Sequence, residues 1–535
     1  MPPKQRKDRP TKRRFAGNRY TGSLKKACLE DEPALQDEDE EACASAKKYK
    51  QTSSAANCVM IPHTLPYCTL VDEDLLNEAV EDAKDWNLMH GNVMRTAEAP
   101  GSSEVVNYAP FLLYPSPFPR VGLQEAKRVQ YAVNKLIHSV ATDFTFLEEV
   151  LQSVIEVDVF TRKLLEICRT VHKEGTSQEI HFGMLRSDYM FDTNTKQIKQ
   201  IEVNAIASSF AGLASKVSMF HRWFLERQGW TVEQTDKHLP ENTAASGLAK
   251  GLIEAWKLYN KQDAVILFVV EPETRNIFDQ RDIEYEVYKQ QPQVRIIRCT
   301  MSKVSKASLD SNSKALLIDG KEVGVVYYRD GYAPDQYTSD EVWQTRLKVE
   351  RSSAIKCPSI QYHLAGTKKV QQVLSKPGML ERFLDAEESA LVRKTFVGLY
   401  SLDMGEEGDA AVAMAMENPG KYVLKPQREG GGNNTFGEAI VDVLGPISDT
   451  VERTAFILME QIHPQSHSNY IIRAGNPPHV ENVISELGVF GVVIGRGKEL
   501  LLNEQHGHLL RTKMMGVDEG GVAMGYGAID SPYLE

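Results

Sequence analysis

The chain has 535 residues, of which 42% are hydrophobic and 25% are charged, an ordinary composition for a globular protein. It contains no run of about 18 apolar residues, so we expect no membrane span. A net charge of −11 argues against nucleic-acid binding by the folded part. The seven cysteines are scattered and form no Cys-x-x-Cys pair, which indicates a reducing, cytoplasmic compartment and argues against disulfides or a zinc site.

Residues 1–60 differ in composition from the rest of the chain. Ten Lys and Arg residues occur up to Lys26 against one acid, and eight acids lie between Glu30 and Glu41. Apolar residues are sparse and show no period, so we expect a disordered extension. A solvated tail is the favoured interpretation, although the run Lys12-Arg13-Arg14 would also suit nuclear or organellar targeting.

Residues 61–264 are expected to form a helical region followed by a β-hairpin. Residues 72–89 carry apolar side chains at helical spacing, and residues 121–173 are predicted to form two or three more helices. The period then changes to two at Ile180–Met184 and Ile198–Val203, which predicts two antiparallel strands.

The end of this hairpin carries candidate metal ligands. Period two places Glu202 and Asn204 on the same face of a strand. A carboxylate and an amide side by side can provide half of a Mg²⁺ site, although the pair alone is a weak signal. Small residues follow at Ala205–Ser209, so a ligand could lie against the backbone there.

Residues 265–369 have the pattern of an inserted α/β unit. Strands predicted at Val265–Val270, Val294–Ile297 and Val323–Tyr328, with a helix at Asn276–Lys289, imply a small parallel sheet. Ligands of such sheets bind beyond the carboxyl ends of the strands, where Arg329 could hold a carboxylate. A salt-bridged surface arginine is the alternative.

The segment Lys425–Asn434 is the most informative of the chain. Its sequence, Lys-Pro-Gln-Arg-Glu-Gly-Gly-Gly-Asn-Asn, follows an apolar strand. Backbone N–H groups of a glycine loop can surround phosphate oxygens, a lysine adds a charge, and Glu429 offers oxygens to Mg²⁺. A mobile surface loop is the alternative to a nucleotide site, and no Walker motif occurs in the chain.

The C-terminal third is predicted to be rich in strands. These are expected at Ala455–Met459, Val483–Ile494 and Leu500–Asn503. Glu486 lies among apolar residues and therefore needs a basic partner or a metal. The segment Gly516–Ala528 is rich in glycine and alanine and has the composition of a flexible lid.

From about Ser102 to the C-terminus, the chain resembles the eukaryotic glutathione synthetase family of the ATP-grasp superfamily. The matching stretches keep the family's order over more than 400 residues: Ser102–Phe111, Arg186–Phe191, Gln200–Asn204, Asn276–Arg281, Arg329–Tyr332, Leu364–Gln372, Lys425–Asn434, Ser485–Gly491, His508–Lys513 and Gly520–Ala523. The resemblance implies an α/β (α+β) ATP-grasp fold with an inserted parallel domain at residues 265–369. It places the core in residues 61–264 and 370–535, with glycine-rich and alanine-rich lid loops in the latter.

The resemblance also implies the reaction and the residues that perform it. The expected activity joins γ-glutamylcysteine to glycine with hydrolysis of ATP, through an acyl phosphate, in a homodimer. Two Mg²⁺ ions would be carried by Glu202, Asn204 and Glu429. ATP would be bound by Glu202, Lys368, Lys425, Gly430, Gly431, Gly432, Asn433, Asn434, Phe436, Met459, Glu460, Gln461, Ile462, Glu486, Lys513 and Glu519. Arg186 and Arg511 would be catalytic. The peptide and glycine would contact these two arginines and Ile206, Ala207, Ser208, Ser209, Thr274, Arg275, Asn276, Gln280, Arg329, Asp330, Gly331, Tyr332, Val522 and Ala523.

Some positions depart from the family pattern. Thr274 stands where close relatives have an acid, Phe436 replaces a tyrosine, Glu519 replaces an aspartate, and Ala205 and Ala207 replace hydroxyl residues. These changes affect individual contacts and not the expected reaction. The alternative is a homoglutathione-type or other carboxylate–amine ligase with a different amine acceptor.

Overall fold

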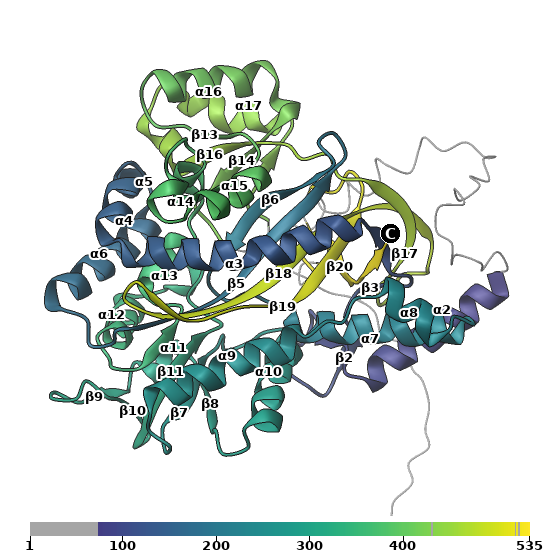
Figure 1. The fold of residues 1–535 in the computed structure, drawn as a ribbon, viewed down its shortest axis with the longest axis horizontal. Coiled ribbons are helices and arrows are strands. Elements are labelled where there is room, and N and C mark those ends of the chain that lie inside the picture. Colours follow the sequence, from purple (N-terminus) through teal and green to yellow (C-terminus); the bar gives the residue numbers. More distant parts are fainter. Residues whose placement is uncertain (1–72, 430–431, 519, 523–524) are drawn as a thin grey trace, which may run out of the picture. The chain divides into compact units, whose positions relative to one another are not determined.

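A seven-stranded sheet holds the two longest strands that the structure describes, β18 (Val480–Arg496) and β19 (Glu499–Met514) (Figure 1). Its order is β17-β3-β20-β19-β18-β5-β6, and all its pairings are antiparallel except that of β20 with β3. The other strands are β17 (Ser466–Ile472), β3 (Phe111–Leu112), β20 (Gly527–Asp530), β5 (Ile180–Asp192) and β6 (Gln197–Asn204). The expected hairpin is therefore confirmed as β5 and β6.

The computed structural model describes residues 73–429, 432–518, 520–522 and 525–535. The expected N-terminal extension lies outside these residues. The described residues belong to one compact unit, Pro62–Glu535. No helix within the described ranges is both long enough and apolar enough to cross a membrane.

Helices pack on both faces of the large sheet. On one face, α3 (Arg120–Thr142) lies so close that added Cβ atoms at Gly491 and Gly495 would meet its side chains. On the opposite face, Gly251 of α9 (Ala244–Tyr259) lies against Val492 and Phe182. Beside α9 lie α7 (Ala211–Arg227) and α10 (Ile277–Gln290).

The helical region contains more helices than expected. Helix α2 (Glu73–Met89) agrees with the prediction, but residues 121–173 hold four helices and not two or three. Besides α3, they are α4 (Phe144–Val150), α5 (Gln152–Val157) and α6 (Val159–Glu174). Asp143 and Asp158 divide this stretch, because each side chain accepts a backbone N–H at the start of a new helix.

The predicted parallel sheet occurs within residues 265–357. Strands β8 (Ile296–Cys299), β7 (Val265–Val269), β11 (Lys321–Tyr328) and β12 (Ile355–Cys357) pair in parallel. Two short antiparallel strands extend it, β10 (Leu316–Ile318) and β9 (Ser308–Leu309). The carboxyl ends of β7 and β11 bring Asn276 and Arg329 toward the same edge of the sheet.

A smaller four-stranded antiparallel sheet follows in the C-terminal third. Its order is β13-β16-β14-β15, with β13 (Leu399–Ser401), β16 (Phe456–Glu460), β14 (Tyr422–Pro426) and β15 (Thr435–Phe436). Helices α16 (Glu406–Glu417) and α17 (Ala439–Leu444) supply buried residues to its core (Figure 1).

The remaining described elements are short. The helices are α8 (Val232–His238), α11 (Met301–Val304), α12 (Asp340–Glu350), α13 (Ile360–Ala365), α14 (Lys368–Leu374) and α15 (Ala386–Thr395). The strands are β1 (Val93–Arg95), β2 (Val106–Tyr108), β4 (Ser116–Phe118) and β21 (Pro532–Leu534), which form two pairs.

Candidate active site

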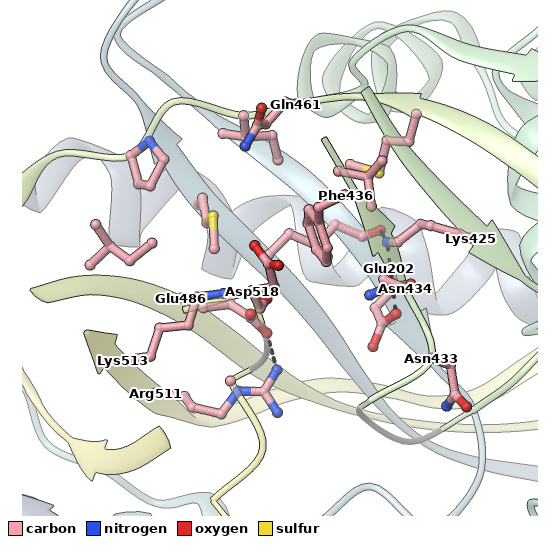
Figure 2. A pocket seen from close by; sticks show the side chains of 18 of the residues that line it. Glu202, Lys425, Asn433, Asn434, Phe436, Gln461, Glu486, Arg511, Lys513 and Asp518 are labelled. Atoms are coloured by element: carbon pink, nitrogen blue, oxygen red, sulfur yellow. Dashed lines mark hydrogen bonds and ion pairs between the residues drawn. The ribbon is translucent and has the colours of Figure 1, made fainter. Parts of the chain in front are cut away.

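A cavity of about 260 Å³ is lined by strands of both antiparallel sheets (Figure 2). The large sheet contributes residues of β5, β6, β18 and β19, and the small sheet contributes β14, β15 and β16. Twelve of the residues expected to bind ATP lie in its wall: Glu202, Lys368, Lys425, Asn433, Asn434, Phe436, Met459, Glu460, Gln461, Ile462, Glu486 and Lys513. The structure thus brings together residues from distant parts of the chain.

Two buried lysines face one carboxylate in this cavity. Lys368 Nζ lies 3.1 Å from Glu202 Oε2, and Lys425 Nζ lies 3.9 Å from the same atom. Burial by itself would raise the pKa of Glu202, but the charges of Lys368 and Lys425 hold it well below its ordinary value. Burial also lowers the pKa of Lys425. With two cations against one low-pKa carboxylate, the centre of the cavity favours an additional anion, such as a phosphate.

Local hydrogen bonds explain why these lysines point inward. Lys368 begins α14, and the side chain of Gln427 accepts the N–H of Lys369 at 3.0 Å, which ties this helix start to the end of β14. Lys425 Nζ donates to the carbonyl of Ile201 at 2.8 Å, which links β14 to β6. The ammonium group of Lys425 is therefore held by a hydrogen bond, and that of Lys368 is held by its ion pair with Glu202.

Glu429 differs from Glu202 in its environment. It lies 3.7 Å from Lys368 Nζ, and burial raises its pKa to about 7, with the neighbouring Glu202 acting in the same direction. Its Oε2 atom is buried without a hydrogen-bond partner among the described residues. A buried, unpartnered carboxylate oxygen beside a second carboxylate is a suitable place for a cation.

The residues fit a Mg²⁺ ion that is held partly by the protein and partly by the phosphates of a bound nucleotide. Within the described ranges, no group of three or more His, Cys, Asp or Glu side chains could hold a metal by itself. Glu202 and Asn204 line the cavity, and Glu429 lies near Lys368. Mg²⁺ typically takes one or two carboxylates and completes its shell with phosphate and water, so this small donor set agrees with a nucleotide-bound ion.

Two arginines also line the cavity. Arg186 donates to both oxygens of Asp188, at 2.6 and 2.7 Å, and to the carbonyl of Ser209 at 3.1 Å. Arg511 forms an ion pair with Glu486, its partner across β18 and β19 (Figure 2). The sequence left two possible partners for Glu486, a basic side chain or a metal, and the structure shows the basic side chain. Burial raises the pKa of Glu486, and the charge of Arg511 opposes that rise.

Apolar side chains line the part of the cavity near β16. Met459 lies in that strand, Ile462 follows its end, and Phe436 lies on β15. Met190, Ile201 and Ile484 of the large sheet also line the cavity. A flat aromatic ring would fit such a surface, as the expected adenine position requires.

Most residues expected to bind the peptide lie outside this cavity. Arg186 and Arg511 line it, but Ile206, Ala207, Ser208, Ser209, Thr274, Arg275, Asn276, Gln280, Arg329, Asp330, Gly331, Tyr332 and Val522 do not. Several of them form a second cluster. Arg329 donates to Ser208 O and Ser209 Oγ, both at 2.6 Å, while Tyr332 donates to Glu271.

This second cluster holds buried polar atoms without partners. Asn276 Oδ1 and Arg329 Nε have no hydrogen-bond partner among the described residues. Ser209 connects the cluster to the cavity, because its carbonyl accepts from Arg186 and its hydroxyl accepts from Arg329. Unpartnered donors and acceptors beside an arginine suit a zwitterionic ligand.

Four expected site residues lie outside the described residues: Gly430, Gly431, Glu519 and Ala523. Gly432 is described and has φ of 91°, a left-handed conformation that favours glycine, but it is not among the lining residues.

Sequence reasoning missed several charged residues of the site. Asp188 is 1% exposed and bonds Arg186, and Arg428 lines the cavity while pairing with Asp158. Period two from Arg186 along the strand would have placed Asp188 on the same face. No comparable signal links Arg428 to Asp158, which lies 270 residues earlier in the chain.

Comparison with known proteins agrees with this geometry. Residues 73–534 match the family model described as eukaryotic glutathione synthase, ATP binding domain. The glutathione synthetases of Bos taurus and Homo sapiens are each 46% identical over 470 residues, which is 87% of this chain and 98% of theirs. The chloroplastic glutathione synthetase of Arabidopsis thaliana is 39% identical over 473 residues.

A solved structure is also similar. The apo form of a glutathione synthetase-like effector from Globodera pallida superposes with a TM-score of 0.70 at 26% identity, covering 87% of this chain and 98% of that one. The fold and the cavity thus define an ATP-dependent ligase. The chain belongs to the eukaryotic glutathione synthetase family and is a ligase of glutathione biosynthesis.

Proposed function

We propose that the chain joins the cysteinyl carboxylate of γ-glutamylcysteine to the amine of glycine, with ATP converted to ADP and phosphate. The observation that carries the proposal is the pair of buried lysines, Lys368 and Lys425, facing Glu202 beside the glycine-rich segment. In this proposal the two antiparallel sheets form an ATP-grasp core, and residues 265–369 form an inserted peptide-binding domain.

In this proposal the site residues act by positioning the substrates and by stabilising negative charge. Lys368 and Lys425 would bind the phosphates, and Phe436 and Met459 would enclose the adenine. The peptide carboxylate would take the γ-phosphoryl group, and the glycine amine would then displace phosphate from the acyl phosphate. Arg511 and Arg186 lie where they could offset the negative charge of these steps.

Mg²⁺ would be held by Glu202, Asn204 and Glu429, together with phosphate oxygens of ATP. When bound, it would neutralise charge on the phosphates and on the transferred group. The presence of two ions remains a proposal, as do a homodimeric assembly and a cytoplasmic location.

Phosphate release tests this function directly. The purified protein is incubated with Mg²⁺-ATP and γ-glutamylcysteine, and then with glycine, β-alanine or no amine. We expect rapid release with glycine only, together with formation of the tripeptide detected by mass spectrometry. Equal phosphate release without any amine, or with every amine offered, would contradict the proposal.

A further inference from the structure

We propose that Asp188 is a positioning residue that turns the amide of Asn204, so that the amide oxygen faces the cavity and its metal. The inference deepens the proposed function and rests on it, because it concerns the site where Mg²⁺ is expected. Asp188 does not itself line the cavity. It acts through Asn204 and Arg186, which both do.

The contacts of Asn204 fix the orientation of its side chain. Its Nδ2 atom lies 2.9 Å from Asp188 Oδ2 and 3.3 Å from the carbonyl oxygen of Arg186. One partner is a carbonyl oxygen, and the other is a carboxylate oxygen that already accepts from Arg186, so only the NH₂ end of the amide can face them. The Oδ1 end must then lie on the opposite side, and Asn204 lines the cavity.

Asp188 is itself held rigidly. Its side chain is 1% exposed, and its two oxygens accept from Arg186 Nε and Nη2 in a bidentate pair. Oδ2 of Asp188 therefore accepts hydrogen bonds from both Arg186 and Asn204, while Oδ1 accepts one from Arg186. The guanidinium of Arg511 lies 3.9 Å from Asp188.

The neighbouring strand leaves room for this arrangement. Gly488 of β18 is the Cα partner of Asp188 in β5. A Cβ atom at Gly488 would lie 2.8 Å from Asp188 Oδ1 and 2.8 Å from Arg186 Cδ, closer than such atoms approach. On the other side, β6 places Glu202 opposite Asp188 and Asn204 opposite Arg186. Residues of three adjacent strands, β18, β5 and β6, thus lie around the carboxylate of Asp188.

The test compares Asp188→Ala with Asp188→Asn, using the Mg²⁺ dependence of binding of a non-hydrolysable ATP analogue measured by calorimetry. Partners of a metal ligand typically contribute about 10- to 100-fold in metal affinity, so we expect a loss of that size in Asp188→Ala. Asparagine has one oxygen, which can take the place of Oδ2 because two donors converge there. Asp188→Asn should therefore keep most of the Mg²⁺ affinity, although Arg186 loses one of its hydrogen bonds.

A double-variant cycle shows whether Asp188 acts through Asn204. Asn204→Ala should weaken Mg²⁺-dependent binding by itself, and adding Asp188→Ala should cause little further loss, because the oriented amide is already absent. Glu350→Ala is the matched control. Glu350 is a buried carboxylate paired with Arg346, and neither residue lines the cavity.

The outcomes separate this inference from the proposed function. Unchanged Mg²⁺ affinity in Asp188→Ala, additive losses in the cycle, or an equal loss in Glu350→Ala would overturn the role of Asp188 alone. Unchanged affinity in Asn204→Ala would overturn both the role of Asp188 and the metal assignment. If Asp188→Ala does not fold, Asp188→Ser replaces it. If that variant also fails to fold, Asp188 is required for folding and the proposal is overturned.

Discussion

Glu202 and Glu429 lie on either side of Lys368, yet the fold holds their carboxyl groups in different states. Glu202 faces two lysines, and their charges lower its pKa. Burial raises the pKa of Glu429 to about 7, and the charge of the neighbouring Glu202 acts in the same direction. A cation beside Glu429 would favour the charged form of this carboxylate. The arrangement therefore makes the charge of Glu429 depend on what the site binds.

Replacing Glu429 by Gln should abolish most turnover while leaving the fold intact. The variant keeps the size of the side chain but removes the negative charge proposed to contact Mg²⁺. Loss of such a contact plausibly lowers kcat by roughly 10²-fold or more. Steady-state kinetics at saturating Mg²⁺ measures the effect, with Glu452→Gln as a control in a segment that does not line the cavity. A near-normal kcat would remove Glu429 from the reaction.

The types of the site residues could be predicted from the sequence more readily than their contacts. The motif order identified Lys368, Lys425 and Glu202 as site residues, and the apolar surroundings of Glu486 indicated a need for a partner. That the partner is Arg511 depends on the register of β18 against β19, which shifts between Val489 and Phe490 at an irregularity that the sequence pattern does not reveal. Arg186 and Asp188 lie two residues apart on one strand, so period two places them on the same face, but it does not show that their side chains pair.

At the scale of elements, β19 shows that the alternation of apolar and polar residues can miss a large part of a strand. The predicted strand Leu500–Asn503 covers only the beginning of β19, which continues to Met514. The polar run Glu504–His508 hides the continuation, and the pairing is shifted where Phe490 of β18 meets His506. A bulge of this kind breaks the alternation that predicts a strand. Arg511 and Lys513 therefore lie in the last part of this strand, just before the segment that begins at Gly516.

Asp530 of β20 provides a test of stability against pH. It is 1% exposed and accepts hydrogen bonds from Ser116, Thr512 and the N–H of Ser531. Burial raises its pKa to about 7. Below its unfolded value of about 3.9 both states are protonated, and between that value and about 7 only the unfolded state ionises. The stability that Asp530 contributes should therefore be lost as the pH rises through this range.

Asp530→Asn should remove this pH dependence, because the amide does not titrate. The difference in melting temperature between wild type and variant is measured from about pH 4 to about pH 8. We expect the wild type to lose stability relative to the variant as the pH rises, by an amount of order a few kcal/mol at most. A difference that stays constant with pH would contradict the assignment.

The segment after β19 is expected to determine which amine the enzyme accepts as a substrate. Val522 is 1% exposed, and Gly521 accepts backbone hydrogen bonds from Tyr526 and from Gly527 at the start of β20. The resemblance implies that Val522-Ala523 is the pair of glycine-using members, and that members using β-alanine have a pair like Leu-Pro here. One methylene is usually discriminated by about 10- to 200-fold.

Replacing Val522 and Ala523 by Leu and Pro should shift kcat/KM from glycine toward β-alanine. Nucleotide binding should not change, since Lys368 and Lys425 lie on α14 and β14. Measuring kcat/KM for both amines on wild type and double variant tests the prediction. If the wild type used β-alanine as well as glycine, the alternative homoglutathione-type activity would replace the proposed one.

At the scale of the whole molecule, the cavity requires contributions that lie far apart in the chain. Glu202 and Asn204 come from β6, Lys425 from β14 and Arg511 from β19. Each strand could be anticipated locally, but the placement of the small sheet against the large one is a tertiary arrangement that no local pattern encodes. Only the resemblance to a known family predicted that these segments would meet.

The N-terminal extension gives the last prediction. The family match begins at residue 73. The glutathione synthetase of Bos taurus aligns over 98% of its own length but over only 87% of this chain. Residues 1–60 have a composition that cannot bury a core, so they should contribute nothing to folding or catalysis. A protein that starts at Ile61 should keep the melting temperature and the kcat of the full chain within error. Scanning calorimetry and the phosphate-release assay on both forms check this. A lower melting temperature or kcat in the shortened form would mean that the extension docks on the enzyme.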